Sequence, residues 1–496
     1  MQFDFIVAVD SNWGIAREGN LPWKRSIAGR EDMEWFKNKT SEDKQALIMG
    51  RKTWESIPTK FRPLSDRINI ILSSKYKGIV TTDLNEKSPV IKSESFDLAL
   101  KWCFDTIKTG HMTNVMVIGG AEVYKQAIYS PYLRYGYITI FNTDYNCDLH
   151  FPINLSSVKY TIINKTENAT YLRYDFTNKH EEKYLNLLSK LLKSPIRDNR
   201  TGIPTQGFMG KMLRFPLYDC RGNIMPLMTT KRVPFKTVAH ELIWFLRGST
   251  NTDYLIQNNV KIWDGNSSFE YLNSVGLTEE PYNYTKGQLG PIYGFQWRNF
   301  NGYYKHQSKN NKVGYISIFV NESPGIDQLT EVIKSIKQNP YSRRHIVCAW
   351  NPEQLHKMAL PPCHVLFQFY VEPDADGKPT WLSCMMYQRS GDQFLGEPFN
   401  VCSYSLLTHM IAQLSGLKAK EFIVSICDVH LYTNHIEQTK EQLCRRPLRF
   451  PTFKFSENIL QKENLTIDDF AFTFTPDDFI IESYKSHATI KAPMAI

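Results

Sequence analysis

The sequence predicts an α/β fold for the first part of the chain, followed by a second and larger unit. In the first part, short apolar runs typical of buried strands alternate with stretches of helical periodicity. Runs without polar alternation fit strands that are buried on both faces, so we expect a central, mostly parallel sheet with flanking helices. The runs are residues 5–9, 46–49, 68–72 and 115–118.

The first unit is predicted to close with a hairpin. Its two arms, residues 135–141 and 171–176, lie on either side of a polar loop. We place the domain boundary in the polar stretch that follows, because the apolar pattern changes there from strand to helix. The expected units are residues 1–178 and 183–496, joined by a short linker of residues 179–182.

The second unit opens with an amphipathic helix. Apolar residues recur at positions i, i+3, i+4 and i+7, and Ser194-Pro195 ends the pattern. These apolar residues are Tyr184, Leu187, Leu188 and Leu191. Further helices are expected at residues 236–247, 326–339 and 400–415, the last with Gly416 as its C-terminal cap.

The composition excludes several classes of protein. The chain has 496 residues, 42% of them hydrophobic and 22% charged, as in an ordinary globular protein of more than one domain. No stretch offers the ~20 apolar residues that a membrane span needs, and no secretory leader is recognisable. Nine scattered cysteines without a Cys-x-x-Cys pair indicate neither a disulfide framework nor a zinc site. We therefore expect a cytoplasmic protein without membrane association or a metal.

Cys363 lies in the most informative stretch of the chain. It follows Pro361-Pro362 and precedes the apolar run 365–371, which is typical of a buried strand. A buried structural cysteine is the simpler interpretation of one such residue. A cysteine near an arginine can instead be a nucleophile, because the cation favours the reactive thiolate. Downstream come Tyr387-Gln388-Arg389-Ser390-Gly391-Asp392 and Pro398-Phe399-Asn400.

With these surroundings the second unit resembles thymidylate synthase, nearly continuously from about residue 181 to residue 496. The resemblance implies an α+β fold and the reductive methylation of dUMP to dTMP by 5,10-methylenetetrahydrofolate. It is carried by short motifs spread over the whole unit. Besides the stretch around Cys363, they are Arg197-Asp198-Asn199-Arg200-Thr201-Gly202, His240-Glu241-Leu242-Ile243-Trp244-Phe245-Leu246, Gly290-Pro291-Ile292-Tyr293-Gly294, Ser342-Arg343-Arg344-His345 and Ile490-Lys491-Ala492-Pro493-Met494-Ala495-Ile496.

The resemblance also implies roles for individual residues. Cys363 would add to C6 of the uracil with Arg389 as its activating cation, and Glu241 would organise water and proton transfer. Asn400 would select uracil through its amide, and Arg343 would reach across a dimer interface together with its neighbour, which implies a homodimer through this domain. The full dUMP-binding set is Arg200, Arg343, Arg344, Ser390, Asp392, Asn400, His430 and Tyr432. The folate-contacting set is Trp263, Asp392 and the terminal Ile496.

Motifs of the first unit together resemble dihydrofolate reductase over roughly residues 1–178. They are Gly14-Ile15-Ala16, Leu21-Pro22-Trp23, Met49-Gly50-Arg51-Lys52-Thr53-Trp54, Ile118-Gly119-Gly120-Ala121 and Val123-Tyr124. The glycine pair follows a predicted strand and precedes a helix, so backbone can approach a cofactor whose phosphates the helix N-terminus favours. The resemblance implies NADPH as this cofactor. Its binding residues would be Ala8, Ile15, Arg51, Lys52, Thr53, Ser73, Gly119, Gly120, Ala121, Glu122, Val123 and Tyr124.

Reduction of dihydrofolate needs one carboxylate in a mostly apolar pocket, to hold the pterin ring and assist protonation of N5. Alignment with the family helix gives Asp32 this position, with Phe36 one turn later on the same face. Glu31 and Glu34 are the alternatives, because residues 24–31 form a longer segment than in many relatives.

Two further residues of the first unit match folate-binding positions of the family. Arg67, just before a predicted strand, matches the arginine that clamps the glutamate carboxylate of folate, a task suited to a guanidinium group. Thr139 matches the threonine that hydrogen-bonds the acid, although a threonine in a strand also fits simple β-propensity.

A single chain with both units resembles the bifunctional dihydrofolate reductase–thymidylate synthases of protozoa and plants. The second site would turn methylenetetrahydrofolate into dihydrofolate, which the first would reduce again with NADPH. Two alternatives stay open. The net charge of +9 suits a nucleotide-related RNA-binding protein, but no basic aromatic module is present and nucleic acid binding is not expected as the main role. A dCMP hydroxymethylase could share the second fold, but Asn400 argues against it, since a cytosine edge favours an acid there.

Overall fold

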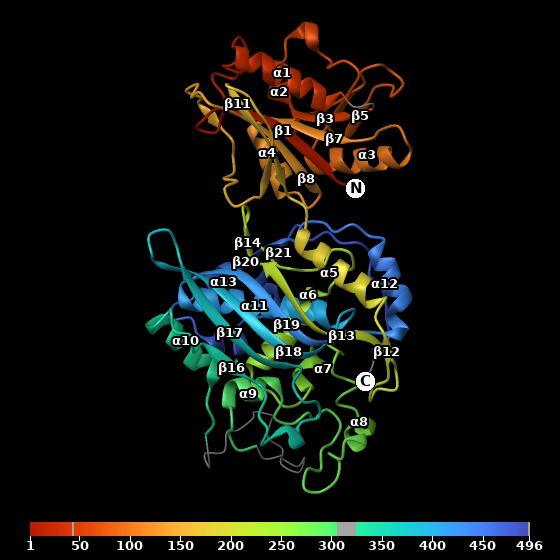
Figure 1. The fold of residues 1–496 in the computed structure, drawn as a ribbon, viewed down its shortest axis with the longest axis vertical. Helices are drawn as coiled ribbons and strands as arrows, with labels where there is room; N and C mark the ends of the chain where they lie inside the picture. Colours follow the sequence, from red (N-terminus) through yellow and green to blue (C-terminus); the bar gives the residue numbers. More distant parts are fainter. Residues whose placement is uncertain (42–43, 305–323, 495–496) are drawn as a thin grey trace. The chain divides into compact units, whose positions relative to one another are not determined.

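The computed structural model describes residues 1–41, 44–304 and 324–494. The chain forms two compact units, each with its own sheet (Figure 1). The first comprises residues 1–178 with 219–221, and the second comprises residues 179–218 and 222–496. Residues 179–182, expected as a linker, are instead the first turn of helix α5 (Lys179–Leu191). The helix can begin there because Glu181 is buried and accepts hydrogen bonds from Thr229 and Thr230.

The first unit contains a nine-stranded sheet with the order β10-β11-β8-β1-β7-β3-β4-β6-β5. The strands from β8 to β6 are parallel, whereas β10, β11 and β5 pair antiparallel at the edges, so the predicted fold class is confirmed. The strands of this unit are β1 (Phe3–Val9), β2 (Gly14–Ala16), β3 (Ala46–Gly50), β4 (Ile68–Leu72), β5 (Ile79–Thr81), β6 (Val90–Ser93), β7 (Val115–Gly119), β8 (Leu133–Phe141), β9 (Leu149–His150), β10 (Tyr160–Lys165) and β11 (Ala169–Asp175).

Helices cover both faces of this sheet because alternate residues of each strand point to opposite sides. Ile6, Leu47 and Met49 form one apolar face with Phe36 of helix α1 (Ile27–Thr40). The opposite face packs against α3 (Phe96–Lys108) and α4 (Ala121–Tyr129). The remaining helix, α2 (Arg51–Ser56), follows β3 directly.

The arms of the predicted hairpin are the antiparallel neighbours β8 and β11, with Phe141 opposite Ala169. The connection between them is more elaborate than a polar loop, because it contains β9 and β10. Strand β10 pairs with β11 and forms the edge of the sheet.

The second unit contains a six-stranded sheet with the order β12-β13-β19-β18-β17-β16. Only β18 and β19 pair in parallel, and the other neighbours are antiparallel. The strands are β12 (Ile196–Arg197), β13 (Thr205–Pro216), β14 (Tyr218–Asp219), β15 (Gly222–Asn223), β16 (Ile346–Cys348), β17 (His364–Pro373), β18 (Pro379–Asp392), β19 (Lys418–Tyr432), β20 (Thr452–Phe455) and β21 (Phe479–Glu482).

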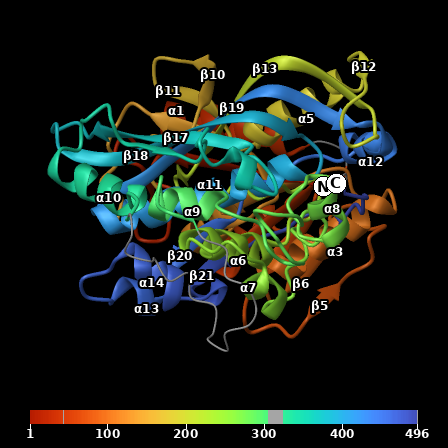
Figure 2. The ribbon, with the colours of Figure 1, turned by 90° about the horizontal axis from the view of Figure 1, so that it is seen from below.

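Helices gather on one face of this sheet, where α9, α10 and α11 lie side by side (Figure 2). The helices are α5 (Lys179–Leu191), α6 (Phe235–Leu246), α7 (Asp253–Gln257), α8 (Phe269–Ser274), α9 (Tyr293–Asn299), α10 (Gln328–Gln338), α11 (Gly396–Ser415), α12 (Ile436–Leu443), α13 (Glu457–Leu460) and α14 (Ile467–Phe472). Sheet and helices together give the expected α+β architecture.

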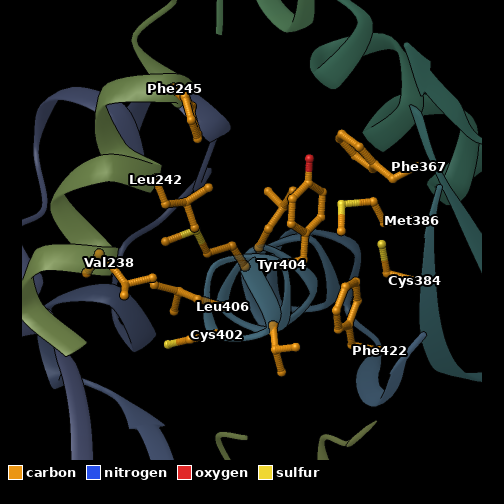
Figure 3. Close-up of a cluster of buried hydrophobic side chains, with 14 of the residues drawn as sticks. Val238, Leu242, Phe245, Phe367, Cys384, Met386, Cys402, Tyr404, Leu406 and Phe422 are labelled. Atoms are coloured by element: carbon orange, nitrogen blue, oxygen red, sulfur yellow. The ribbon is translucent and has the colours of Figure 1, made fainter. Parts of the chain in front are cut away.

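Helix α11 is the centre of the second core. Figure 3 shows its Tyr404 and Leu406 between side chains of α6, such as Leu242, and side chains of the sheet, such as Phe367 and Met386. The helix begins at Gly396 rather than at the predicted residue 400, because a proline such as Pro398 is tolerated in a first turn. Its end is confirmed, with Gly416 as a left-handed cap at φ 68°.

No helix in the described part of the chain is long and apolar enough to cross a membrane.

Candidate active sites

In the first unit, the predicted cofactor residues gather at the carboxyl ends of parallel strands. Strands β1, β7, β3 and β4 are neighbours and run in the same direction, so the segments that follow them meet at one edge of the sheet. Most of the predicted residues lie in these segments or at the strand ends. They are Ala8 in β1, Arg51, Lys52 and Thr53 after β3, Ser73 after β4, and Gly119, Gly120, Ala121, Glu122, Val123 and Tyr124 at the junction of β7 and α4, while Ile15 is in β2.

The glycine pair keeps this edge open for close backbone approach. Gly119 has φ +126°, a conformation that favours glycine, and a Cβ there would lie 3.2 Å from the Tyr124 hydroxyl. A Cβ on Gly120 would lie 3.2 Å from Thr53 Oγ1, so the start of α4 and the start of α2 are close together. The arrangement brings the N-terminus of α4 close to the first turn of α2, which carries Arg51, Lys52 and the Thr53 hydroxyl, and there Arg51 pairs with Glu55.

Asp32 is a buried acid on the inner face of α1. Burial raises its pKa from 3.8 to about 6, and the nearby Thr139 hydroxyl opposes that rise. The Thr139 hydroxyl is itself buried and makes no hydrogen bond of standard geometry with another described residue. Asp32 also raises the pKa of Tyr124 and of Tyr171, although burial is the main cause in both, so the acid lies between the cofactor edge and strand β11.

The two alternative acids of this helix have different surroundings. Glu34 is exposed. Glu31 is half-buried and accepts hydrogen bonds from Thr166 at 3.1 Å and Asn168 at 3.5 Å, which leaves it committed to the loop between β10 and β11. Of the three acids, only Asp32 is buried.

One face of helix α1 carries a row of three residues that ends at an arginine from another segment of the chain. Asp32, Phe36 and Thr40 are four residues apart and share one face, and eight residues of helix span about 12 Å. Arg67 donates from Nη1 to Thr40 Oγ1 at 3.0 Å. Burial lowers its pKa, and no carboxylate of the described residues lies within 4.0 Å of its guanidinium group. The neighbouring Asp66 opposes this pKa shift without forming an ion pair, so the buried cation can bind a ligand carboxylate.

In the second unit, strand pairing brings the predicted cysteine and arginine together. Cys363 directly precedes β17, and its neighbour His364 lies opposite Gln388 of β18. The Arg389 backbone N–H donates to the Cys363 carbonyl at 2.9 Å. The Arg389 guanidinium donates to the carbonyls of Pro362 and Pro361, at 2.9 and 2.7 Å. The cation is therefore fixed against the segment that carries the thiol.

Glu241 is connected to Cys363 through two aromatic residues. It accepts a hydrogen bond from Trp263 Nε1 at 2.8 Å, and burial raises its pKa to about 7. The Trp263 ring lies 6.0 Å from the ring of Tyr293, whose hydroxyl accepts a 2.8 Å hydrogen bond from the Cys363 N–H. The charges of Cys363 and Glu241 both contribute to the raised pKa of Tyr293, after burial as the main cause. Glu241 keeps part of its surface accessible.

The ends of the parallel strands β18 and β19 carry half of the predicted nucleotide residues. Ser390 lies opposite Asp428, and Asp392 lies opposite His430. Burial raises the pKa of Tyr432, with smaller electrostatic contributions from Asp392, Arg200 and Cys363. Tyr432 thus links the arginine, the acid and the thiol of this site.

Asn400 lies on the second turn of α11 and faces two other residues of the site. Its carboxamide interacts with His364, and burial lowers the pKa of that imidazole to about 4, so the imidazole is neutral at physiological pH. It also interacts with Glu397 on its own helix. His364 follows Cys363 directly, which places the amide beside the thiol segment.

Three of the predicted residues are not brought into this site. Arg343 and Arg344 are exposed before β16, and neither guanidinium makes a hydrogen bond or ion pair within the described part of the chain. Ile496 lies outside the described residues.

The structure adds residues that the sequence did not single out. Tyr293 and His364 lie within motifs that were recognised, but nothing in the motifs said that they contact the cysteine or the asparagine. Glu397 is fully buried beside Asn400. An acid in the first turn of a helix usually faces solvent, so the sequence held no signal for its burial.

Each unit thus has its own site with an acid whose pKa is raised by burial, which defines a two-domain enzyme. Residues 2–183 match the family model of dihydrofolate reductase, and residues 182–496 match that of thymidylate synthase. The chain is 38% identical to the bifunctional dihydrofolate reductase-thymidylate synthase of Leishmania major, with 100% of this chain and 95% of that protein covered.

Relatives of the same description come from distant organisms. That of Zea mays is 37% identical, with 100% of this chain and 97% of that protein covered. That of Paramecium tetraurelia is 37% identical, with 100% and 99% covered. The chain belongs to the family of bifunctional dihydrofolate reductase–thymidylate synthases. It is an oxidoreductase and a methyltransferase in one polypeptide, and neither the RNA-binding nor the hydroxymethylase alternative is supported.

Proposed function

We propose that the first domain reduces dihydrofolate to tetrahydrofolate and that the second methylates dUMP to dTMP with 5,10-methylenetetrahydrofolate, each through the residues gathered above. Domain limits of about residues 1–178 and 183–496 belong to this proposal. So does a reducing, cytoplasmic compartment, which is supported by nine scattered cysteines without a Cys-x-x-Cys pair.

The edge formed by β7, β3 and β4 is the proposed NADPH site. Its residues fit the cofactor, because Gly119 and Gly120 leave space that a Cβ would fill. Arg51, Lys52 and Thr53 would hold phosphate groups together with the N-terminus of α4. When bound, NADPH supplies the hydride. The protein would position the pterin against it.

Asp32 is the proposed proton-handling group of the reductase. A pKa of about 6 means that the carboxyl can hold or release a proton near neutral pH, which is what general acid catalysis requires. Thr139 would fix its orientation. Phe36 would line the pocket between the pterin and the glutamate tail, and Arg67 would bind the tail carboxylate at the other end of the helix.

Cys363 is the proposed nucleophile of the synthase. Its sulfur adds to C6 of the uracil, which makes C5 a nucleophile toward the methylene carbon, and Arg389 is held against the segment that carries the sulfur. Arg200, Arg389 and Ser390 would bind the nucleotide phosphate. His430 and Tyr432 would bind the sugar, and Asn400 would read the pyrimidine edge.

Glu241 is the proposed acid–base group of the same reaction. With a pKa raised to about 7, it can exchange a proton at neutral pH while Trp263 holds one of its oxygens. Trp263 and Asp392 would contact the folate substrate, and the C-terminal Ile496 would close over it.

We also propose that the second domain forms a homodimer through the free face of its sheet. This face is opposite α11 and exposes large apolar side chains, which is unusual for a surface that stays in water. Tyr370 is 59% exposed and Met212 47%. Strand pairing sets Leu366, Tyr387, Ser425 and Met212 side by side across four strands. A two-fold dimer would bury this row and let Arg343 and Arg344 complete the partner's phosphate site.

The observation that carries the proposal is that each unit gathers the residues of one site around an acid whose pKa burial raises toward neutrality, Asp32 in the first unit and Glu241 in the second. The test is a reciprocal loss of activity. Cys363→Ala should abolish dTMP formation and leave dihydrofolate reduction near normal, and Asp32→Asn should do the reverse. The exposed Cys444→Ala is the matched control. Loss of both activities in a folded Cys363→Ala protein contradicts two independent sites.

A further inference from the structure

Glu397 is a buried acid that the proposed mechanism does not use. It lies in the first turn of α11, and its side chain is 0% exposed. Neither of its carboxyl oxygens has a hydrogen-bond partner of standard geometry among the described residues. An ionised carboxylate in such a place is very unfavourable, so a protonated carboxyl or a specific set of donors is required.

Two carboxamides lie beside this carboxyl. Gln388 of β18 and Asn400 of α11 both interact with Glu397. The Gln388 amide has a defined orientation, because its Nε2 donates to the Ser390 carbonyl at 3.0 Å. Its Oε1 therefore points the other way, and it is buried without a donor among the residues described. A proton on Glu397 is the hydrogen-bond donor that this oxygen lacks.

The Asn400 carboxamide must also be held in one of its two possible orientations to distinguish uracil from cytosine. An asparagine amide can read uracil by accepting from N3–H through Oδ1 and donating to O4 through Nδ2. If the amide is flipped, the same side chain matches the reversed donor and acceptor pattern of cytosine. Glu397 and Asn400 are three residues apart on one helix face, so the carboxyl is in reach of one end of the amide. His364 lies at the amide from strand β17.

We propose that Glu397 is a positioning residue of the synthase site, which donates its proton to Gln388 Oε1 and accepts from Asn400 Nδ2. Held in this way, the Asn400 carboxamide keeps the orientation that reads uracil and rejects cytosine. The inference rests on the proposed role of Asn400 as the reader of the pyrimidine edge.

The surroundings of Glu397 favour its neutral form. Burial raises its pKa to about 8, hydrogen bonding with Gln388 and Asn400 opposes this rise, and the negative charge of Asp392 on β18 adds to it. Tyr184 of α5 is the other titratable group that faces it, and the pKa of that phenol is raised well above its ordinary value. His364, across Asn400, is neutral. None of these described groups offers a positive charge to stabilise an ionised Glu397.

The test compares two substitutions in the full-length protein by the dissociation constants of dUMP and dCMP. Glu397→Gln keeps one donor and one acceptor, so the preference for dUMP should stay within about threefold of wild type. Glu397→Leu removes both, and the preference should fall about tenfold, which corresponds to one hydrogen bond of about 1.4 kcal/mol. Glu437, exposed in the first turn of α12, provides the control variants Glu437→Gln and Glu437→Leu. An unchanged preference in a folded Glu397→Leu protein overturns the proposal.

A pH series gives a second readout that does not depend on the leucine variant. Above about pH 8 wild-type Glu397 loses the proton that it donates, so the dUMP preference should decline as pH rises, whereas Glu397→Gln should not show this decline. Identical profiles for the two proteins overturn the proposal. Asn400→Ala separates the two levels of inference. If this variant keeps the preference for dUMP, Asn400 does not read the pyrimidine edge, and the positioning role of Glu397 is refuted as well. If Asn400→Ala abolishes the preference and Glu397→Leu keeps it, only the positioning role of Glu397 is refuted.

Discussion

Replacing Asp32 by asparagine should lower activity and raise stability, with a pH dependence set by the burial of the carboxyl. The folded protein holds the pKa of Asp32 at about 6 instead of 3.8, which corresponds to about 3 kcal/mol of unfolding free energy. Because the folded pKa is the higher one, the native state binds more protons than the unfolded state. The carboxyl therefore costs nothing at low pH, and the cost grows as pH rises through about 6.

The asparagine variant lacks this cost. Its advantage in unfolding free energy should be about 0.5 kcal/mol at pH 4 and about 3 kcal/mol at pH 7.5. Dihydrofolate reduction should fall by ~10²–10⁴-fold at neutral pH, and by less in acid, where the pterin takes its proton from solvent.

The assays are NADPH oxidation with dihydrofolate and the thermal unfolding of the first domain, both between pH 4 and pH 8. Glu34→Gln, which removes an exposed acid of the same helix, should change neither. The reasoning is refuted if Asp32→Asn reduces dihydrofolate at the wild-type rate at pH 7 while Glu31→Gln or Glu34→Gln does not.

Three further outcomes are expected. Glu241→Gln should keep dUMP binding and the Trp263 hydrogen bond but lower dTMP formation by ~10²–10⁴-fold. The change of the rate with pH near pH 7 should disappear in this variant, and if that pH dependence is retained, it belongs to another group. Mixing inactive Cys363→Ala and Arg343→Ala chains should restore synthase activity, because one site of a mixed dimer is whole; verified exchange without recovery shows that the arginines act within their own chain. Arg67→Ala should raise KM for dihydrofolate by about 10- to 100-fold with a smaller change in kcat, and an unchanged KM removes it from the folate site.

The strands and the linear motifs could be predicted from sequence because their signals are local. The four apolar runs of the first unit became β1, β3, β4 and β7, since continuous apolar runs of four or five residues are too short for a typical buried helix and fit strands buried on both faces. The choice of Asp32 over its neighbours rested on alignment alone. Its burial and the half-buried state of Glu31 depend on how α1 lies on the sheet, which no local pattern encodes.

Features that depend on tertiary contacts could not be predicted from the sequence. Residues 179–182 look like a polar linker, yet Glu181 is fully buried because two threonines far along the chain donate hydrogen bonds to it. Glu397 has the appearance of an ordinary helix-start acid, and only the approach of β18 to α11 shows that it is enclosed. The exposed apolar face of the second sheet appears only when β13, β17, β18 and β19 are placed in register.

The most direct test of two coupled active sites is a molar ratio. It compares the NADPH that is oxidised with the dTMP that is formed when the protein is given dUMP and 5,10-methylenetetrahydrofolate. Without NADPH, dihydrofolate should accumulate in equal amount to dTMP. With NADPH, one molecule should be oxidised for each dTMP, and Cys363→Ala should stop both processes in this assay while still reducing added dihydrofolate. Formation of dTMP without matching NADPH oxidation, or NADPH oxidation that continues in Cys363→Ala without added dihydrofolate, would contradict the assignment.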